Sequence, residues 1–230
     1  MADSLVVGDE VEISIDRVAH GGHCVGRFEG QVVFVRHTLP GERVKARITK
    51  VAKRMAFADA IEIIAAAPHR VAPPCSVASV CGGCDWQHVD IAYQRQLKAE
   101  VLHEQLLRLG HWSDAPNVEV RTLRAEENGL GWRTRVEYAT DPRGRAGFRE
   151  HSSHIVVPVA HCPVAVPQIT GDGITNVPWA SQSRVRAVAS STGDVVILPE
   201  GGGDVAIEER VADETYELFA GNFWQAHLNA

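Results

Sequence analysis

Three cysteines fall within a single ten-residue stretch, and this cluster constrains the fold more than any other feature of the sequence. Cys75, Cys81 and Cys84 are separated by five and two residues, and a Gly-Gly pair stands between the last two. Glycines let the backbone wrap closely around a bulky inorganic centre while several thiolates converge on it. Cys162, in the distant sequence His-Cys-Pro, is a candidate for the fourth ligand.

The spacing alone leaves three interpretations of these cysteines open. Structural zinc usually shows paired knuckles with two residues between the cysteines. Three clustered cysteines plus one remote cysteine beside a proline are more typical of an iron–sulfur cluster. The third interpretation is that the thiols are buried without a ligand. Cys24 lies outside this arrangement and is expected to be a small buried apolar side chain.

The length of 230 residues is sufficient for two modest hydrophobic cores. The first residues include acidic side chains and lack both a basic segment and a long apolar run. We therefore expect no signal peptide, no membrane span and a cytoplasmic location. Five cysteines in a reducing compartment are not expected to form a disulfide framework, which favours a metal or cluster site.

The net charge of −6 conceals a strong segregation of charge along the chain. Between residues 17 and 54 basic side chains far outnumber acidic ones, whereas residues 194–217 are rich in Asp and Glu. A basic surface of this kind is usually a solvated face, but the scarcity of acidic residues favours a surface that follows RNA phosphates. Arg36, Lys45 and Arg47 are the predicted RNA contacts on it.

Residues 10–64 alternate apolar and polar positions in short runs separated by turn signals, which predicts half-buried β-strands over residues 10–17, 31–37, 43–50 and 56–64. A small closed β-barrel is the economical arrangement, because closure removes the exposed sheet edges. Prolines then interrupt the pattern, so we place a boundary between Ala65 and Pro74. The predicted domains are an all-β barrel over residues 1–66 and a second domain over residues 67–230.

The second domain is predicted to be α+β. Residues 89–109 carry apolar positions at helical spacing, with Asp90 as a possible cap and Gly110 as the stop. Strand-like runs follow, and the last four of them are typical of antiparallel strands joined by short turns. These runs cover residues 134–139, 147–149, 155–159, 184–190, 194–199, 204–209 and 215–219.

Several motifs occur in a fixed order after the barrel. The cysteine cluster continues as CGGCDWQH at residues 81–88, and residues 131–135 read GWRTR. Residues 147–163 read GFREHSSHIVVPVAHCP, and residues 222–225 read NFWQ. Together these motifs resemble those of the bacterial RNA uracil-5-methyltransferases. The barrel before them resembles the TRAM domain that such enzymes use to hold RNA.

The resemblance implies a structural 4Fe-4S cluster and a set of RNA contacts. Arg133 takes the position of an RNA-contacting arginine in the family. Phe223 would stack on a flipped uridine, and Gln225 would form a hydrogen bond near the uracil or the methyl donor, S-adenosylmethionine. The cluster ligands implied are Cys75, Cys81, Cys84 and Cys162.

The residues of the GWRTR run also support a prediction of their own. Arg133 and Arg135 alternate along a probable strand, so both side chains would lie on one face and could bind phosphates. The alternative is a solvated strand face on which these arginines pair with Glu137.

The family's catalytic cysteine, its base and its Rossmann-like domain have no counterpart in this sequence, which ends five residues after Gln225. No glycine-rich strand–turn–helix fingerprint is present. We therefore expect a monomeric, RNA-binding portion of an enzyme that makes 5-methyluridine in ribosomal or transfer RNA. A longer protein or a separate polypeptide would supply catalysis. The alternative is a non-enzymatic iron–sulfur module that binds RNA.

Overall fold

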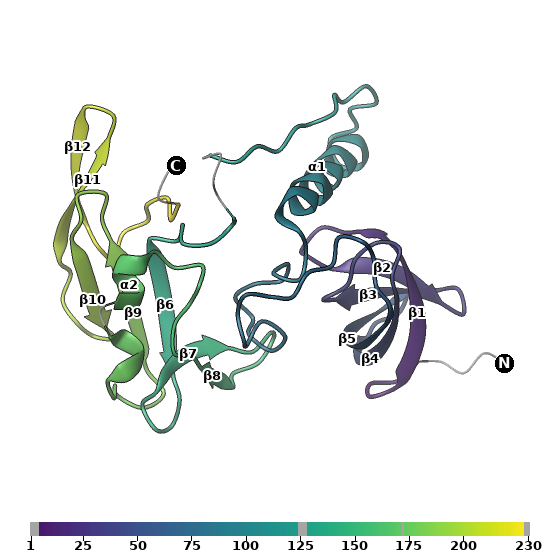
Figure 1. The fold of residues 1–230 in the computed structure, drawn as a ribbon, viewed down its shortest axis with the longest axis horizontal. Coiled ribbons are helices and arrows are strands. Elements are labelled where there is room, and N and C mark those ends of the chain that lie inside the picture. Colours follow the sequence, from purple (N-terminus) through teal and green to yellow (C-terminus); the bar gives the residue numbers. More distant parts are fainter. Residues whose placement is uncertain (1–4, 124–127, 172, 228–230) are drawn as a thin grey trace. The chain divides into compact units, whose positions relative to one another are not determined.

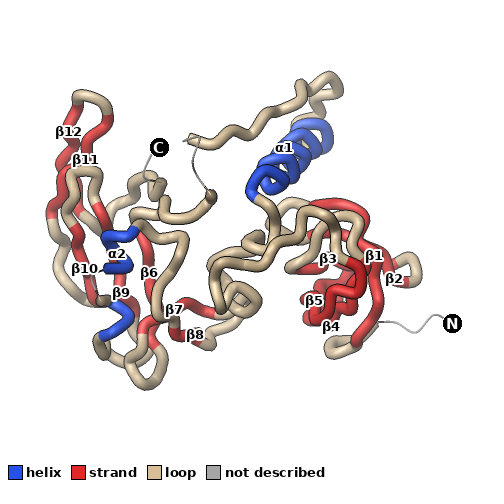
Figure 2. Tube along the Cα trace, viewed as in Figure 1, coloured by secondary structure: helices blue, strands red, loops and turns tan. Residues whose placement is uncertain are grey.

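The computed structural model describes residues 5–123, 128–171 and 173–227. They form two compact units that are interleaved along the chain, and strands predominate in both (Figure 2). The first unit consists of Met1–Pro73 and Cys84–Arg121, and the second consists of Pro74–Gly83 and Thr122–Ala230. The predicted domains were two continuous segments, residues 1–66 and 67–230, whereas each compact unit combines two separate segments. The domain boundary therefore stays a prediction.

The first unit contains a closed five-stranded barrel (Figure 1). Its neighbouring strands are ordered β1-β2-β3-β5-β4, and all pairs are antiparallel except β3 with β5. This confirms the predicted β-barrel. The strands are β1 (Glu10–Val18), β2 (Cys24–Phe28), β3 (Gln31–Arg36), β4 (Arg43–Val51) and β5 (Met55–Ala65).

Strand β2 was not among the predicted strands, and its burial explains why. Cys24, Val25 and Gly26 are all buried in succession, so the strand lacks the alternation that marks a half-buried strand in the sequence. Gly26 also lies so close to β1 that an added Cβ would stand 2.3 Å from the Ser14 carbonyl oxygen. Only glycine permits this approach of two strands.

Helix α1 (Ile91–Arg108) begins and ends where the sequence predicts. The Asp90 carboxylate accepts hydrogen bonds from the amides of Ala92 and Tyr93, at 3.0 and 3.1 Å. The Gly110 amide donates to the Gln105 carbonyl at 3.1 Å and terminates the helix. The helix packs with the barrel, because its Leu97 side chain is buried in the barrel core.

The second unit is rich in antiparallel strands. One sheet has the order β10-β9-β6-β7-β8, and β11 pairs with β12 in a separate hairpin. Every ladder between these strands is antiparallel in the described residues. The elements are β6 (Arg135–Thr140), β7 (Ala146–Arg149), β8 (Val156–Pro158), α2 (Pro167–Gly171), η1 (Ile174–Asn176), β9 (Arg184–Ala189), β10 (Val195–Pro199), β11 (Ala206–Val211) and β12 (Glu214–Phe219).

The α+β prediction is therefore confirmed for the antiparallel strands but needs correction for the helix. The predicted helix exists, yet it belongs to the unit that contains the barrel. Its apolar residues Tyr93, Leu97 and Val101 pack against the barrel core, which the periodicity of a helix cannot specify in advance. The helices of the second unit, α2 and η1, are short.

A buried ion pair fixes the chain that leaves the barrel. The Glu42 side chain has no exposed surface and lies 2.6 Å from the Arg70 guanidinium. Its carboxylate also accepts hydrogen bonds from the amides of Leu39 and Ala67, at 2.8 and 3.2 Å. Burial alone would raise the pKa of Glu42, but the bonds from Arg70 and the two amides outweigh it and lower the pKa below its ordinary value.

We predict that Glu42→Gln lowers the free energy of unfolding by about 3 kcal/mol at pH 7, because Arg70 then lacks its buried counter-charge. Since the folded-state pKa of Glu42 is lowered, the stabilisation is complete above its ordinary pKa of 4.5 and is lost as the pH falls through the folded value. The difference from wild type should therefore shrink in acid. Urea unfolding at several pH values measures it.

The matched control is Glu10→Gln. The Glu10 carboxylate is also paired with cations, Lys45 and Arg47, but it is accessible to solvent. Solvent screens that pair, so the control should lose far less stability. Equal losses in the two variants would contradict the role assigned to Glu42.

Candidate functional site

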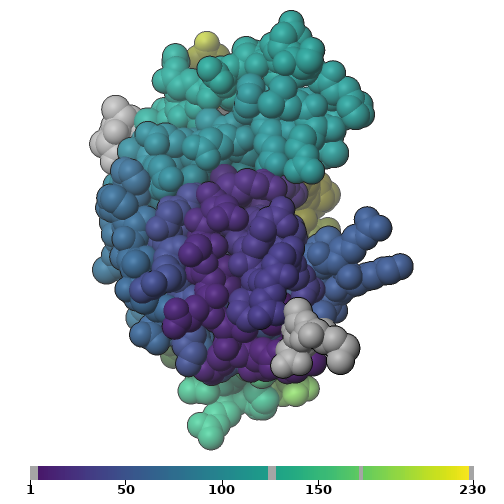
Figure 3. All heavy atoms as spheres, turned by 90° about the vertical axis from the view of Figure 1, so that its right-hand side faces the viewer, coloured from purple at the N-terminus to yellow at the C-terminus, as the bar shows by residue number. Residues whose placement is uncertain are grey.

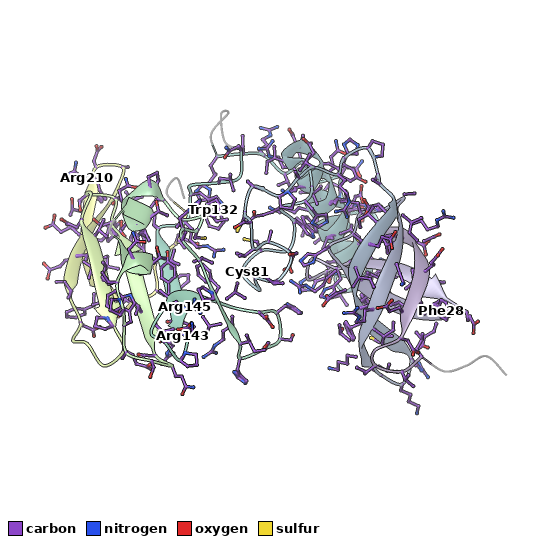
Figure 4. The ribbon with its side chains drawn as sticks, turned by 60° about the horizontal axis from the view of Figure 1, so that its bottom comes forward. Phe28, Cys81, Trp132, Arg143, Arg145 and Arg210 are labelled. Atoms are coloured by element: carbon purple, nitrogen blue, oxygen red, sulfur yellow. The ribbon has the colours of Figure 1, made fainter. Side chains whose placement is uncertain are left out.

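The cysteine loop, on which Figure 4 labels Cys81, pairs with the chain at the end of β7. Cys81 pairs with Glu150 as an isolated β-bridge, and the Gly82 amide donates to the Arg149 carbonyl at 2.9 Å. A Cβ on Gly82 would lie 3.0 Å from that carbonyl oxygen, so the close approach favours glycine. The cysteine loop therefore lies directly against the end of β7.

Three of the four predicted ligand cysteines belong to the second unit. Cys81 and Cys162 are buried and Cys75 is half-buried. A cavity of 210 Å³ separates the chain around Cys75 from the chain around Cys162, since residues 74–77 line one part of it and residues 158–161 and Pro163 line the other. Cys84 is half-buried and belongs to the first unit.

The donor set was tested against the chemistry of an iron–sulfur cluster. The Gly83 amide donates to the Cys81 sulfur at 3.3 Å, a type of bond that supports cluster thiolates. The thiols lie on loops, as cluster ligands require. Nevertheless, the described residues contain no group of three His, Cys, Asp or Glu side chains placed to hold a metal ion. The residue types and their positions outside the named helices and strands fit a cluster.

Residues directly after Cys84 are fixed to the barrel. The Asp85 carboxylate accepts hydrogen bonds from the Arg36 guanidinium, the shorter at 2.9 Å. The Trp86 indole donates to the Gly22 carbonyl at 2.8 Å. Arg36 has only 4% of its side chain exposed, so its guanidinium is an internal anchor. We therefore withdraw Arg36 from the predicted RNA contacts.

Lys45 and Arg47 alternate with buried residues along β4, so both side chains point out of the barrel. Figure 3 faces the barrel strands, which are purple to dark blue in it. Their side chains are 40% and 55% exposed. Both bind the carboxylate of Glu10 on β1, at 2.6 and 2.8 Å. Hydrogen bonds from these two cations lower the pKa of Glu10, and the bond to Glu10 raises the pKa of Lys45. Two cations thus share the Glu10 carboxylate, and Glu62 on β5 lies opposite Lys45 and also raises its pKa.

The two arginines of the GWRTR run occupy different environments. Arg133 is half-buried, and its guanidinium lies 5.1 Å from the ring centroid of Trp132. Arg135 has 12% of its side chain exposed and pairs with buried Glu209 at 3.1 Å. The expectation that Arg135 binds phosphate is therefore wrong. The pairing partner is also not Glu137, because Glu137 binds Arg186 instead.

Arg135 and Arg186 hold the chain before Phe223. Arg135 donates to the Ala220 carbonyl at 2.9 Å, and Arg186 donates to the Gly221 carbonyl at 3.0 Å. Phe223 itself is 87% exposed, and Gln225 is exposed as well.

The chain after Phe223 is fixed by Trp224, Ala226 and His227, which lie on either side of the exposed Gln225. Trp224 lies against Tyr216, with ring centroids 5.7 Å apart, and His227 stacks on Trp132 at 5.2 Å. The Thr134 amide donates to the Ala226 carbonyl at 2.7 Å. Phe223 and Gln225 therefore project from a segment that is held on both sides.

Comparison with known proteins matches the barrel to a domain family and the whole chain to longer proteins. The family model for the TRAM domain matches residues 5–61. An uncharacterised RNA methyltransferase of Streptomyces coelicolor is 39% identical over 268 aligned residues, which cover 98% of this chain and 58% of the relative. Nearly the whole chain is thus similar in sequence to an RNA methyltransferase. A Corynebacterium efficiens RNA methyltransferase is 34% identical, with 98% of this chain and 57% of the relative covered.

Two further matches carry more specific names. The 23S rRNA (uracil(1939)-C(5))-methyltransferase of Halomonas elongata is 41% identical over 69% of this chain and 33% of its own length. The tRNA (uracil-54, C5)-methyltransferase of Pyrococcus abyssi, solved with S-adenosyl-L-homocysteine, superposes with a TM-score of 0.62. That match covers 94% of this chain and 62% of the other at 19% identity, so it shows a shared fold.

The chain thus spans less than two thirds of the length of these relatives. Among the described residues, no helix combines the length and the apolar character needed to cross a membrane.

We predict that Arg135→Ala loosens the segment that carries Phe223. Glu209 would lose its buried partner, so the free energy of unfolding should fall by about 3 kcal/mol. Amide hydrogen exchange at Ala220 and Asn222 should accelerate, because the carbonyl contacts of Arg135 are lost. Arg184→Ala is the control, since Arg184 binds Glu200 at 2.8 Å and does not contact the segment. Equal acceleration in both variants would contradict the assignment.

Proposed function

We propose that this chain forms the RNA-recognition and iron–sulfur portion of an enzyme that methylates uracil C5 in ribosomal or transfer RNA. The observation that carries the proposal is the relation to RNA methyltransferases over 98% of the chain. The Halomonas relative, named for uracil-C5 methylation of 23S rRNA, supports the choice of base. S-adenosylmethionine would be the methyl donor of the complete enzyme, with Gln225 contributing a hydrogen bond near it.

RNA recognition is assigned to two surfaces. Lys45 and Arg47 on the barrel would bind phosphates, because both side chains are exposed and can exchange the Glu10 carboxylate for a phosphate. On the second unit, Arg133 would bind a phosphate and Phe223 would stack on the extruded uridine. Extrusion is required because C5 and C6 of uracil are inaccessible inside a stacked helix. The exposed Phe223 side chain on a segment whose backbone is held supports this role, since a segment that is already ordered loses less entropy on binding.

The cluster ligands are proposed to be Cys75, Cys81, Cys84 and Cys162. A bound 4Fe-4S cluster would cross-link the cysteine loop to the loop that carries Cys162. Metal binding is coupled to folding, because the unfolded chain rarely contains a preformed site, so assembly of the cluster would itself order the two loops. Cys24 is not a ligand, since burial raises the pKa of its thiol to about 12 and the Cys24 sulfur donates to the Thr38 carbonyl.

The cluster assignment predicts about four irons per chain and broad absorption near 400 nm in anaerobically purified protein. Cys162→Ser should lose most of the iron and absorption, because an incomplete ligand shell exposes the cluster. Cys24→Ser should retain both and serves as the control. Elemental analysis and visible spectra measure the result. One zinc and no iron per chain would refute the cluster while preserving the ligand assignment.

The barrel assignment predicts that replacing Lys45 and Arg47 together by Gln weakens RNA binding. The affinity for structured RNA should fall about tenfold at low salt, and the slope of log affinity against log salt should decrease by about two, because two phosphate contacts are lost. Fluorescence anisotropy over a salt series measures both quantities. Arg210→Gln, in the acidic part of the chain, is the control. Unchanged affinity in the double variant would place the RNA on another surface.

A further inference from the structure

The second unit contains a cavity of 400 Å³ that has no role in the function proposed above. Its size lies in the range of small-molecule sites and is sufficient for one nucleotide. Three parts of the chain line it: the glycines of the cysteine loop, the strands β6, β7 and β9, and the turn after β7. The lining includes Gly83, Glu137, Tyr138, Phe148, Arg149 and Glu150.

The cysteine loop keeps one wall of this cavity flat. Gly82 and Gly83 contribute backbone without side chains, and the Gly82 amide is bonded to the Arg149 carbonyl. A Cβ on Gly83 would meet only the Cys81 sulfur, at 3.4 Å. The wall is therefore formed by peptide groups, which planar ligands can approach closely.

The opposite part of the cavity is aromatic. Tyr138 has 1% of its surface exposed, and its ring lies 4.9 Å from that of Phe148. Phe148 is only half-buried, so part of its ring remains accessible. An accessible ring beside a flat peptide wall is suited to a nucleobase, because every base has a face that stacks on aromatic side chains.

Charged groups line the cavity in a nearly balanced set. Arg149 is exposed, and its guanidinium has no partner in the part of the chain that the structure describes. Arg184 is bound by Glu200 at 2.8 Å, and Glu137 is bound by Arg186 at 3.0 Å. The Glu150 carboxylate likewise has no ion pair among the described residues. One available cation beside one available carboxylate suits a single phosphate and a base edge, whereas a polyphosphate would be repelled.

We propose that this cavity binds one unpaired nucleotide of the RNA, separate from the uridine to be methylated. Phe148 stacks on its base, Arg149 binds its phosphate, and Glu150 accepts a hydrogen bond from the base edge. Carboxylates accept from the N–H donors of bases, and single-stranded nucleotides are the form in which those edges are accessible. The proposal rests on the RNA-binding function proposed above and adds a second recognition site to it.

The test uses the full chain with a fluorescent stem–loop RNA that has an unpaired pyrimidine loop, and with a duplex of the same stem. Arg149→Gln should weaken stem–loop binding about tenfold and leave duplex binding unchanged. Phe148→Leu, which keeps an apolar side chain in the sheet, should weaken stem–loop binding as well. Arg210→Gln is the matched control, because Arg210 is an exposed arginine at the far end of the same unit (Figure 4).

A second measurement locates the contact directly. With 4-thiouridine in the loop of the RNA, ultraviolet light should cross-link wild-type protein within residues 146–152, and the cross-link should disappear in Phe148→Leu. Equal losses of stem–loop and duplex affinity in Arg149→Gln would overturn the proposal in favour of a general phosphate contact. Displacement of the stem–loop by millimolar uridine monophosphate would also overturn it, because the ligand would then be a free nucleotide.

The outcomes distinguish a failure of the nucleotide cavity from a failure of the RNA-binding function of the chain. Wild-type protein that binds neither RNA would refute the RNA-binding function itself. RNA binding that depends on Lys45 and Arg47 but not on Arg149 would refute the cavity alone.

Discussion

The Glu42 carboxylate, buried without any exposed surface, determines where the chain goes after the barrel. Its bonds to Arg70 and to the Ala67 amide hold the segment after β5 against the connection between β3 and β4. The Val71 amide then donates to the His88 carbonyl at 2.9 Å, so the chain that returns from the cysteine loop lies beside it. Helix α1 starts directly afterwards. A carboxylate in this position is stable only because every bond it needs is supplied within the fold.

Burial separates arginines that look alike in the sequence. Arg36 and Arg135 are nearly buried and serve internal ion pairs with Asp85 and Glu209. Arg47 and Arg149 are exposed, and Arg149 has no bonding partner among the described residues. A guanidinium that is already desolvated and paired gains little from a phosphate, whereas an exposed one can exchange water and counterions for it. The proposed RNA surface is therefore smaller than the basic segment of the sequence indicates.

The glycines of the cysteine loop allow it to lie directly on the end of β7, as the bond between Gly82 and Arg149 shows. In the proposed enzyme the same loop would hold the cluster and form the wall of a nucleotide cavity, so that metal assembly and RNA recognition would share one piece of backbone.

The sequence by itself determined the barrel, the helix with its Asp90 cap and the antiparallel strands, because these depend on local periodicity and turn residues. The spacing of the cysteines also indicated which of them are candidate ligands. The sequence missed β2, whose consecutive buried residues show no alternation. Only the tertiary structure decided that α1 packs on the barrel, that Arg36 and Arg135 are internal and that the Phe223 segment is held by Arg135 and Arg186. These features arise from contacts between residues far apart in the chain, and burial of a charged side chain is a property of the fold that no local pattern records.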